Sequence, residues 1–428
     1  MASIQPFRAV RYATATGADI TPLTAPPYDV IPADLRAELL ARDPHNVVAL
    51  ELPSGSLDPS IPGNRYETGA ATWRSWLDDG VLAFDAAPAI YVLEQRYRHG
   101  STDVARRGFI AAVSLEPFSA GVVLPHERTL PKALGDRLNL TRATAANLSQ
   151  VFGMFGDPAH ATDPFIAKAM ESLPLATATD DDGVVSTVWA LTDPADQARL
   201  AELLADEKVF IADGHHRYTT ALAYRDEQRA AGSPAGAPSD TVMMALVNMD
   251  DPGLVVYPTH RIVDAPGAFD ADAFFAALTE HFEVGDLPKG HPSAALADAE
   301  RPTFIVATQD ETKVVRLRTD VDHSVAFPAT SSEAWRALDV AVLQELILSP
   351  LLDVHPDRPE TLDRLSFSKD AHAAMKATTD HDVVFILNPT KMSQVAAVAL
   401  AGETMPQKST YFYPKLLSGL LFKSLDRA

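Results

Sequence analysis

The feature that most constrains the fold is a short apolar run that leads directly into a helical pattern, VFIADGHHRYTTALAYRDEQ at residues 209–228. The four residues Val209–Ala212 have the composition of a buried strand. Asp213 and Gly214 interrupt the run, and glycine lets a backbone turn sharply. The stretch therefore predicts a strand, a tight turn and a helix, which is a building unit of α/β proteins.

Segments with helical and with strand periodicity alternate along the rest of the chain. Helical spacing predicts helices at residues 33–42, 66–77, 147–155, 271–281, 335–348 and 392–400. Alternating or continuous apolar runs predict strands at residues 89–94, 109–115, 187–191, 242–249, 254–257 and 383–387, and a hairpin of 303–307 with 313–317. This mixture predicts a mixed α/β (α+β) fold.

The composition excludes several classes of protein. Without cysteine, the chain can form no disulfide, no thiolate nucleophile and no cysteine-ligated metal site. Its 57 acidic and 36 basic side chains give a net charge of −21, which repels nucleic acid in the absence of a basic patch. The N-terminus lacks the pattern of a signal peptide, and no apolar run approaches about 18 residues. We therefore expect a cytoplasmic protein with no nucleic-acid or membrane partner.

The residues at the strand-to-helix corner suit a phosphate group. A helix N-terminus offers backbone N–H groups and the positive end of the helix dipole. Gly214 would let a ligand approach the backbone closely, and Arg217 could bind a phosphate through two parallel hydrogen bonds. The candidate phosphate-binding residues are Gly214, His215, His216, Arg217 and Thr219.

Asp213 would be unfavourable beside a bare phosphate, so it needs a role of its own. It could hold Mg²⁺, or it could orient an imidazole or a hydroxyl. The alternative is that Asp213 only caps the helix and that the histidines lie on the surface. Zinc is a weaker interpretation, because adjacent histidines on a helix point about 100° apart.

A second polar cluster lies upstream, in LPHERTLPKALGDRLNLTRATAANLSQVF at residues 124–152. Its two prolines predict a loop over residues 125–131, and loops held on a scaffold often carry function. Glu127 is a candidate general base, with His126 beside it. The basic residues that could neutralise phosphates, or could each belong to a solvated face, are Arg128, Lys132, Arg137 and Arg142.

Together, the HERT box with a following DRL and the later DGHHR box resemble the free L-serine kinases of the ParB/sulfiredoxin-like superfamily. In those kinases a short segment like PHE supplies a catalytic glutamate, and DGHHR binds nucleotide phosphates. The boxes lie much farther apart here, so the resemblance implies an insertion near residues 150–205. The matching residues are His126, Glu127, Asp213, Gly214, His215, His216 and Arg217.

Nearly the whole chain is similar to the DUF1015 family, a group named for lacking an assigned function. The matching boxes are APPYDVI (25–31), NVVALELP (46–53), HERT (126–129), ADGHHRYTTAL (212–222), PTHRIV (258–263) and MPQKSTYFYPKLLSGLLF (405–422). The resemblance implies three parts. They are an N-terminal α/β region at 1–115, a ParB/serine-kinase-like core with its insertion at 116–265, and a C-terminal α/β region at 266–428.

The remaining boxes add candidate binding residues. The prolines of APPYDVI fix an extended backbone that presents Tyr28 and Asp29, or they form a rigid turn. The aromatic residues and lysines of QKSTYFYPK suit an adenine and its phosphates, or a buried aromatic hairpin. The further nucleotide candidates are Lys408, Ser409, Thr410 and Lys415. The substrate candidates are Arg142, His260, Arg261 and Asp29.

These residues lead to the hypothesis of a kinase that uses Mg²⁺ and ATP or ADP to phosphorylate free L-serine. Glu127 would accept the hydroxyl proton, Asp213 would lie near the metal, and His126 or His216 would stabilise the transferring group. The chain has neither a P-loop nor the motifs of protein kinases. The alternatives are a phosphohydrolase, in which Glu127 activates water, and a non-catalytic nucleotide-binding regulator of the ParB-like superfamily.

Overall fold

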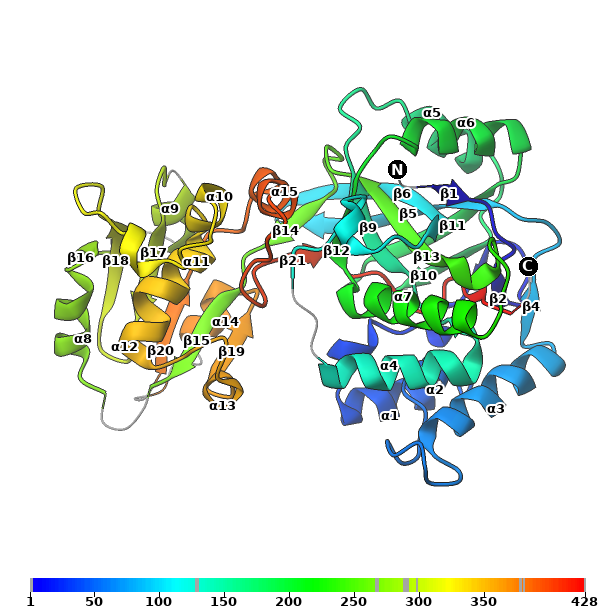
Figure 1. The fold of residues 1–428 in the computed structure, drawn as a ribbon, viewed down its shortest axis with the longest axis horizontal. Helices are drawn as coiled ribbons and strands as arrows, with labels where there is room; N and C mark the ends of the chain where they lie inside the picture. The colour runs from blue at the N-terminus through cyan, green and yellow to red at the C-terminus, as the bar shows by residue number, and fades with distance from the viewer. Residues whose placement is uncertain are drawn as a thin grey trace. The chain divides into compact units, whose positions relative to one another are not determined.

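The computed structural model describes residues 3–127, 131–265, 269–287, 292–297, 299–376, 379 and 382–426. The chain forms two compact units (Figure 1). Unit 1 comprises Met1–Pro125, Thr129–Val255 and Pro414–Ala428, and unit 2 comprises His126–Arg128 and Val256–Tyr413. Both units contain sheets and helices, which confirms the mixed α/β class.

Within the described residues, unit 1 is built on a ten-stranded sheet. In order across the sheet, the strands are β3 (Ala18–Asp19), β10 (Ala176–Thr179), β11 (Val185–Leu191), β5 (Ile90–His99), β6 (Thr102–Ser114), β13 (Thr241–Asn248), β9 (Val151–Phe155), β12 (Val209–Asp213) and β7 (Val123–Leu124), with β1 (Ile4–Gln5) paired to β6. Two short pairs join β2 (Val10–Tyr12) to β4 (Leu82–Phe84) and β8 (Ala146–Asn147) to β22 (Lys423–Ser424).

Helices cover both faces of this sheet (Figure 1). On one side lie α5 (Asp163–Met170) and α6 (Pro194–Leu204). On the other side, α7 (His215–Ala230) packs against α4 (Pro131–Thr144), which in turn packs against α3 (Arg65–Asp78). The short helices α1 (Ala33–Arg42) and α2 (Val48–Glu51) lie beside them. The core forms where both layers bury the apolar side chains of the strands.

In the described part of unit 2, the strands form a six-stranded antiparallel sheet. Its order is β16 (Phe282–Asp286), β18 (Thr312–Leu317), β17 (Thr303–Ala307), β20 (Asp382–Ile386), β15 (His260–Asp264) and β19 (Leu365–Ser368). A separate pair joins β14 (Val255–Tyr257) to β21 (Tyr411–Tyr413). The helices are α8 (Ala271–Leu278), α9 (Pro292–Ala297), α10 (Glu333–Arg336), α11 (Asp339–Leu343), a π-helix at Gln344–Leu348, α12 (Ser349–Leu352), α13 (Pro359–Leu362), α14 (Ala371–Lys376) and α15 (Met392–Leu400).

The predicted helix at residues 147–155 is wrong. Residues 146–147 form β8, and Val151–Phe155 form β9, in which every residue is buried. A short, fully apolar run has no periodicity that distinguishes a buried strand from a buried helix. In the strand, a Cβ at Gly153 would lie 2.6 Å from the sulfur of Met244 on the neighbouring β13. Glycine has no Cβ, so it fits at this position.

The predicted long helix at 335–348 is interrupted. Leu338 has an extended backbone (φ −74°, ψ 131°) and ends the helical run between α10 and α11. The Leu338 side chain is fully buried in a cluster with Val395 and Met405. The chain therefore leaves the helical conformation at a residue that packs into the core.

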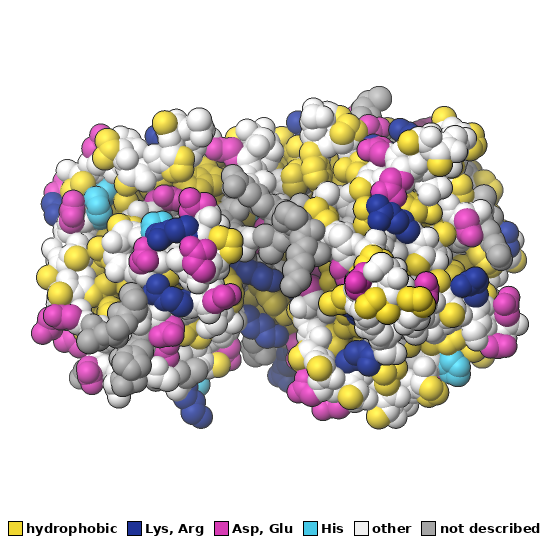
Figure 2. Space-filling model, turned by 60° about the horizontal axis from the view of Figure 1, so that its bottom comes forward, with side chains coloured by type: hydrophobic (Ala, Val, Ile, Leu, Met, Phe, Trp, Pro, Cys, Tyr) yellow, Lys and Arg dark blue, Asp and Glu magenta, His cyan; other side chains and the backbone are white. Residues whose placement is uncertain are grey.

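The strands on either side of the expected boundary at residue 115 share one sheet, because β6 pairs with β13. The three-part division stays a prediction. Figure 2 shows acidic side chains spread over the surfaces of both units, in keeping with the net charge of −21. In the part of the chain that the structure describes, no helix has the length and hydrophobicity needed to cross a bilayer.

Candidate functional site

The strand-to-helix corner forms as the sequence predicts. β12 contributes Val209–Ala212 to the core, and burying each large apolar side chain stabilises the fold by about 1.5–3 kcal/mol. The register of β12 against β9 shifts between Ile211 and Asp213, and such a bulge re-aims the next side chain. Gly214 then adopts the left-handed region (φ 89°, ψ 29°), and α7 begins at His215.

Gly214 is required at this corner for two reasons. Its positive φ is unfavourable for other residues. A Cβ at this position would also lie 2.9 Å from Nε of Arg217. Because glycine is the N-cap residue, no side chain at this position covers the positive end of the α7 dipole.

Asp213 lies between two cations in unit 1. Its Oδ2 accepts a hydrogen bond from Arg217 Nη2 at 3.0 Å, and its Oδ1 accepts one from Lys415 Nζ at 3.4 Å. Burial alone would raise the pKa of Asp213, but Lys415 and Arg217, with His215, hold it well below its usual range. Asp213 is therefore a carboxylate at every physiological pH.

Arg217 is held in place on two sides. Besides Asp213, it donates from Nη1 to the backbone oxygen of Gln150. A guanidinium has five N–H groups, and these two bonds use two of them. The remaining N–H groups give Arg217 the capacity to bind a ligand without leaving Asp213. Thr219 and Thr220, one turn along α7, carry buried hydroxyl oxygens that have no partner among the described residues.

A cavity of about 40 Å³ in unit 1 adjoins Arg217. At this volume it holds a few waters or the polar end of a small ligand. It is lined by residues from the N-terminal boxes and from α4 and α7, including Tyr28, Glu51, Arg137, Ser149, Arg217 and Thr220. The cavity thus brings together parts of the APPYDVI, NVVALELP, DRL and DGHHR boxes.

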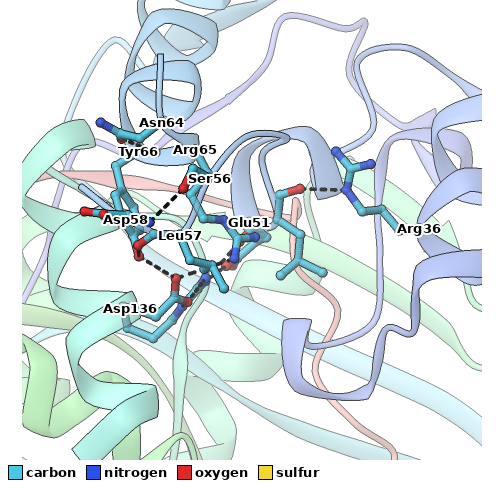
Figure 3. A network of polar contacts seen from close by, with 11 residues as sticks. Arg36, Glu51, Ser56, Leu57, Asp58, Asn64, Arg65, Tyr66 and Asp136 are labelled. Carbon is cyan, nitrogen blue, oxygen red and sulfur yellow. Dashed lines mark hydrogen bonds and ion pairs between the residues drawn. The ribbon is translucent and has the colours of Figure 1, made fainter. Parts of the chain in front are cut away.

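A buried ionic network supports this cavity (Figure 3). Arg137 donates from Nη1 to Glu51 Oε2 at 3.2 Å and from Nη2 to Asp136 Oδ2 at 2.6 Å. Asp136 also accepts from the hydroxyl of Tyr66 at 3.0 Å and pairs with Arg65 at 3.6 Å. The Arg137 guanidinium lies 4.2 Å from the ring centre of Tyr28, and burial raises the pKa of Tyr28 to about 12.

Glu51 was not among the candidates that the sequence motifs suggested. An acidic residue among the apolar residues of NVVALELP is the signal that could have revealed it, because a buried carboxylate requires a partner. That partner is Arg137, which the sequence suggested only as one of several cations.

In unit 2, three boxes that are distant in sequence meet. Glu127 Oε1 accepts from the backbone N–H of Lys408 at 3.1 Å. His126 Nε2 lies 3.1 Å from Thr410 Oγ1, and its ring packs edge-on against Phe412. Lys408 has a φ of 55°, a strained value for a non-glycine residue, and such strain is concentrated at functional positions.

Arg261 contacts the same backbone segment of unit 2 as Glu127. It is buried and donates to the backbone oxygens of Thr259, Gln407 and Lys408. Burial lowers the pKa of Arg261 to about 9, although Glu127 opposes the shift. Arg261 thus remains charged at neutral pH, and it fixes the backbone segment that holds Glu127.

His260, the other member of the THR box, begins β15 and is buried. Its Nδ1 accepts from the backbone N–H of Leu387 at 3.2 Å. Burial lowers its pKa from the usual 6.5 to about 4, and Arg261 adds to the shift while Asp370 opposes it. A neutral imidazole is the form that can accept this hydrogen bond.

His260 predicts a pH dependence of stability. Between pH 6.5 and about 4 the unfolded state binds a proton that the folded state does not, so stability falls as the pH is lowered through this window. Urea unfolding of the wild type and of His260→Asn, which keeps an acceptor but does not titrate, should show a larger loss for the wild type between pH 7 and pH 5. Equal losses would contradict the assignment.

Two expected binding residues, Arg142 and Asp29, are not among the residues that line the cavity at Arg217. Arg142 is exposed on α4 and forms a bidentate pair with Glu227 at 2.5 and 2.9 Å. Asp29 is exposed in a 3₁₀ helix at Tyr28–Val30.

His216 is half-buried in the first turn of α7. Ser409 donates to the backbone oxygen of Pro406. Arg128 and Thr129, with the side chain of Lys132, lie outside the described residues.

No cluster of three or more histidine, aspartate or glutamate side chains that could hold a metal ion occurs among the described residues. Asp213, the residue expected to lie near Mg²⁺, already interacts with Arg217 and Lys415. Protein sites commonly bind Mg²⁺ through one or two carboxylates together with the phosphates of a nucleotide, so a role for Asp213 near the metal stays a prediction.

A family model described as a protein of unknown function (DUF1015) matches residues 4–341. None of the curated proteins matches the chain. Among solved structures, a conserved hypothetical protein from Pyrococcus furiosus is 14% identical, with a TM-score of 0.33, over 69% of this chain and 89% of that one.

Two further solved structures are similar. A free serine kinase in complex with AMP is 13% identical, with a TM-score of 0.34, over 68% of this chain and 84% of that one. A C-terminally truncated SbnI from Staphylococcus aureus is 12% identical, with a TM-score of 0.35, over 72% and 85%. The likeness is remote at these TM-scores, so the function of this protein has to be inferred from its own residues.

Proposed function

The chain belongs to the DUF1015 family, and we propose that it is a kinase that transfers a phosphoryl group from ATP or ADP to free L-serine, giving O-phosphoserine. The observation that carries the proposal is the corner at Asp213–Arg217. A glycine N-cap after a buried strand, at the positive end of a helix, is the geometry that binds phosphates in other nucleotide sites.

The charges around the corner favour a polyphosphate. Arg217 and Lys415 are two cations that share the single carboxylate of Asp213, so this group is net positive before any ligand binds. In the proposal, Gly214 to Arg217 bind the donor phosphates. Asp213 keeps Arg217 and Lys415 oriented toward them, and it would be a carboxylate near Mg²⁺, which would neutralise charge on the phosphates.

The cavity beside Arg217 supports an amino acid as the acceptor. Glu51 and Arg137 form a buried ion pair, and both line it. A free amino acid carries an ammonium and a carboxylate, and this pair offers a group of each sign. The hydroxyl of Thr220, which has no partner among the described residues, adds a donor and an acceptor for a small polar side chain.

Glu127 is the proposed general base. Its carboxylate is held by the Lys408 N–H, and a carboxylate can accept the hydroxyl proton during the transfer. His126 is a proposed stabiliser of the transferring group. Lys408, Ser409 and Thr410 stay proposed nucleotide contacts.

The test is an assay of purified protein with Mg²⁺ and either ATP or ADP, with and without L-serine, in which O-phosphoserine is followed by mass spectrometry. Phosphoserine formed with one donor supports the kinase and identifies the donor. Loss of nucleotide without phosphoserine would overturn the serine kinase and favour a phosphohydrolase. Nucleotide binding without turnover would favour a regulator.

Replacing Gly214 with alanine tests the phosphate site separately from the chemistry. Alanine is strained at a φ of 89°, and its Cβ would meet Arg217 at 2.9 Å. We expect the Kd for ATP or ADP to rise by at least about tenfold, since a strain of about 1–3 kcal/mol disturbs the groups that bind phosphate. Isothermal titration calorimetry measures it. Gly232→Ala, at φ 98° just after the other end of α7, is the matched control and should leave the Kd unchanged.

A further inference from the structure

Unit 1 contains a second and larger cavity, of about 360 Å³. It lies among residues 5–8, the end of β6, the 3₁₀ turn at Pro238–Asp240 and the strand β22. It shares no lining residue with the cavity at Arg137. Its volume is within the range of small-molecule sites, and its wall combines apolar residues such as Phe7 and Leu115 with about as many polar and charged residues.

Lys423 lines this cavity and is 4% exposed. Its Nζ donates to the backbone oxygens of Pro238 at 2.6 Å and of Thr241 at 3.4 Å. No described carboxylate pairs with it, although buried lysines are rarely left without an acidic partner.

The charged side chains around the same cavity do not supply that partner. They are Arg8, Glu116, Arg229 and Asp240. Asp240 accepts from Arg229 Nε at 2.9 Å and from the backbone N–H of Gly236 at 2.8 Å. Beyond Lys423 on the same strand, Ser424 donates to Asp426.

Two carbonyl acceptors match an uncharged amine. A neutral –NH₂ group has two N–H bonds, which the oxygens of Pro238 and Thr241 accept, and one lone pair, whereas an ammonium would leave a third N–H to satisfy. Burial lowers the pKa of Lys423 to about 7. Near neutral pH, a large fraction of this lysine is therefore a nucleophilic amine beside a cavity.

We propose that this cavity is a second binding site of unit 1, which takes a small aldehyde and holds it as an imine on Lys423 Nζ. The amine nitrogen attacks the carbonyl carbon and forms a C–N bond, while a proton moves from nitrogen to oxygen. The resulting carbinolamine loses water and leaves a C=N bond. These steps need no oxidant or reductant, and they are reversible.

The test uses benzaldehyde as the probe and sodium cyanoborohydride to trap the imine as a benzylamine, which peptide mass spectrometry locates. Lys423 is expected to react at least about tenfold faster at pH 7 than Lys168 and Lys313. Lys168 is exposed and Lys313 is half-buried, and their ion pairs with Asp196 and Asp286 raise their pKa values, so they stay protonated.

Two further readouts distinguish binding of the aldehyde in the cavity from direct reaction of a lysine amine without prior binding. The labelling rate at Lys423 should saturate with benzaldehyde concentration and should rise with pH around a midpoint near 7. Lys423→Gln keeps an uncharged –NH₂ group with two N–H donors and should fold like the wild type but carry no label at this position. Labelling of Lys423 no faster than that of Lys168, or a rate that stays linear with benzaldehyde, would overturn the proposal. Neither result depends on kinase activity.

Discussion

Replacing Glu127 with glutamine is expected to lower the rate of phosphoserine formation by about 10²–10⁴-fold, the usual contribution of a general base. The amide oxygen can still accept the hydrogen bond from the Lys408 N–H, so the local structure is kept. An amide cannot take up the hydroxyl proton, so only the chemical step is lost. The Kd for nucleotide should stay within about twofold of the wild type, since the difference then corresponds to less than about 0.5 kcal/mol.

Single-turnover kinetics and calorimetry on the same preparations measure the two quantities. Glu360→Gln, an exposed glutamate on α13 of the same unit, is the control for the change of charge and should retain full activity. A Glu127→Gln enzyme with wild-type turnover would remove Glu127 from the mechanism. Loss of nucleotide binding instead of turnover would reassign Glu127 to the donor site.

Replacing Arg137 with methionine is expected to destabilise unit 1 by about 3–5 kcal/mol, because removing one partner leaves a buried charge uncompensated. Glu51 is 3% exposed and would lose its ion pair, and Asp136 would lose one of its two cationic partners. Urea unfolding followed by tryptophan fluorescence measures this, since Trp73, Trp76 and Trp189 all lie in unit 1.

Arg142→Met is the matched control, because Arg142 lies on the same helix and pairs with Glu227 in solvent. An exposed ion pair contributes about 0–1 kcal/mol, so this variant should unfold close to the wild type. The double variant Glu51→Gln, Arg137→Met removes both charges and should recover part of the loss. Equal destabilisation by Arg137→Met and Arg142→Met would show that the network does not support the fold.

The sequence predicted well where the determinants of structure are local. The turn at Gly214 follows from the conformational freedom of one residue, and the helix that begins at His215 follows from spacing within one segment. The strand at residues 151–155 was missed because its conformation depends on neighbours in the sheet, as the contact of Gly153 with Met244 shows.

The ion pairs that give the site its electrostatics could not be predicted from local patterns. Glu51 and Arg137 are 86 residues apart, and Asp213 and Lys415 are 202 apart, so no spacing relates them. No sequence pattern pointed to Lys423 either. That no described carboxylate pairs with it is a property of its surroundings in the folded protein. The sequence predicted which segments carry the polar and charged residues of the site. It did not predict which of these residues form ion pairs with each other.

The discontinuity of unit 1 has a consequence for how the protein is made. The segment Pro414–Ala428 belongs to unit 1 but comes after all of unit 2, and it supplies both Lys415 and the strand β22. Domains usually fold in order as the ribosome releases them, at about 5–20 residues per second. Unit 1 is instead complete, with Lys415 beside Asp213, only after unit 2 has been synthesised. A nascent chain thus gains the Asp213–Lys415 contact only after the ribosome has added residue 415.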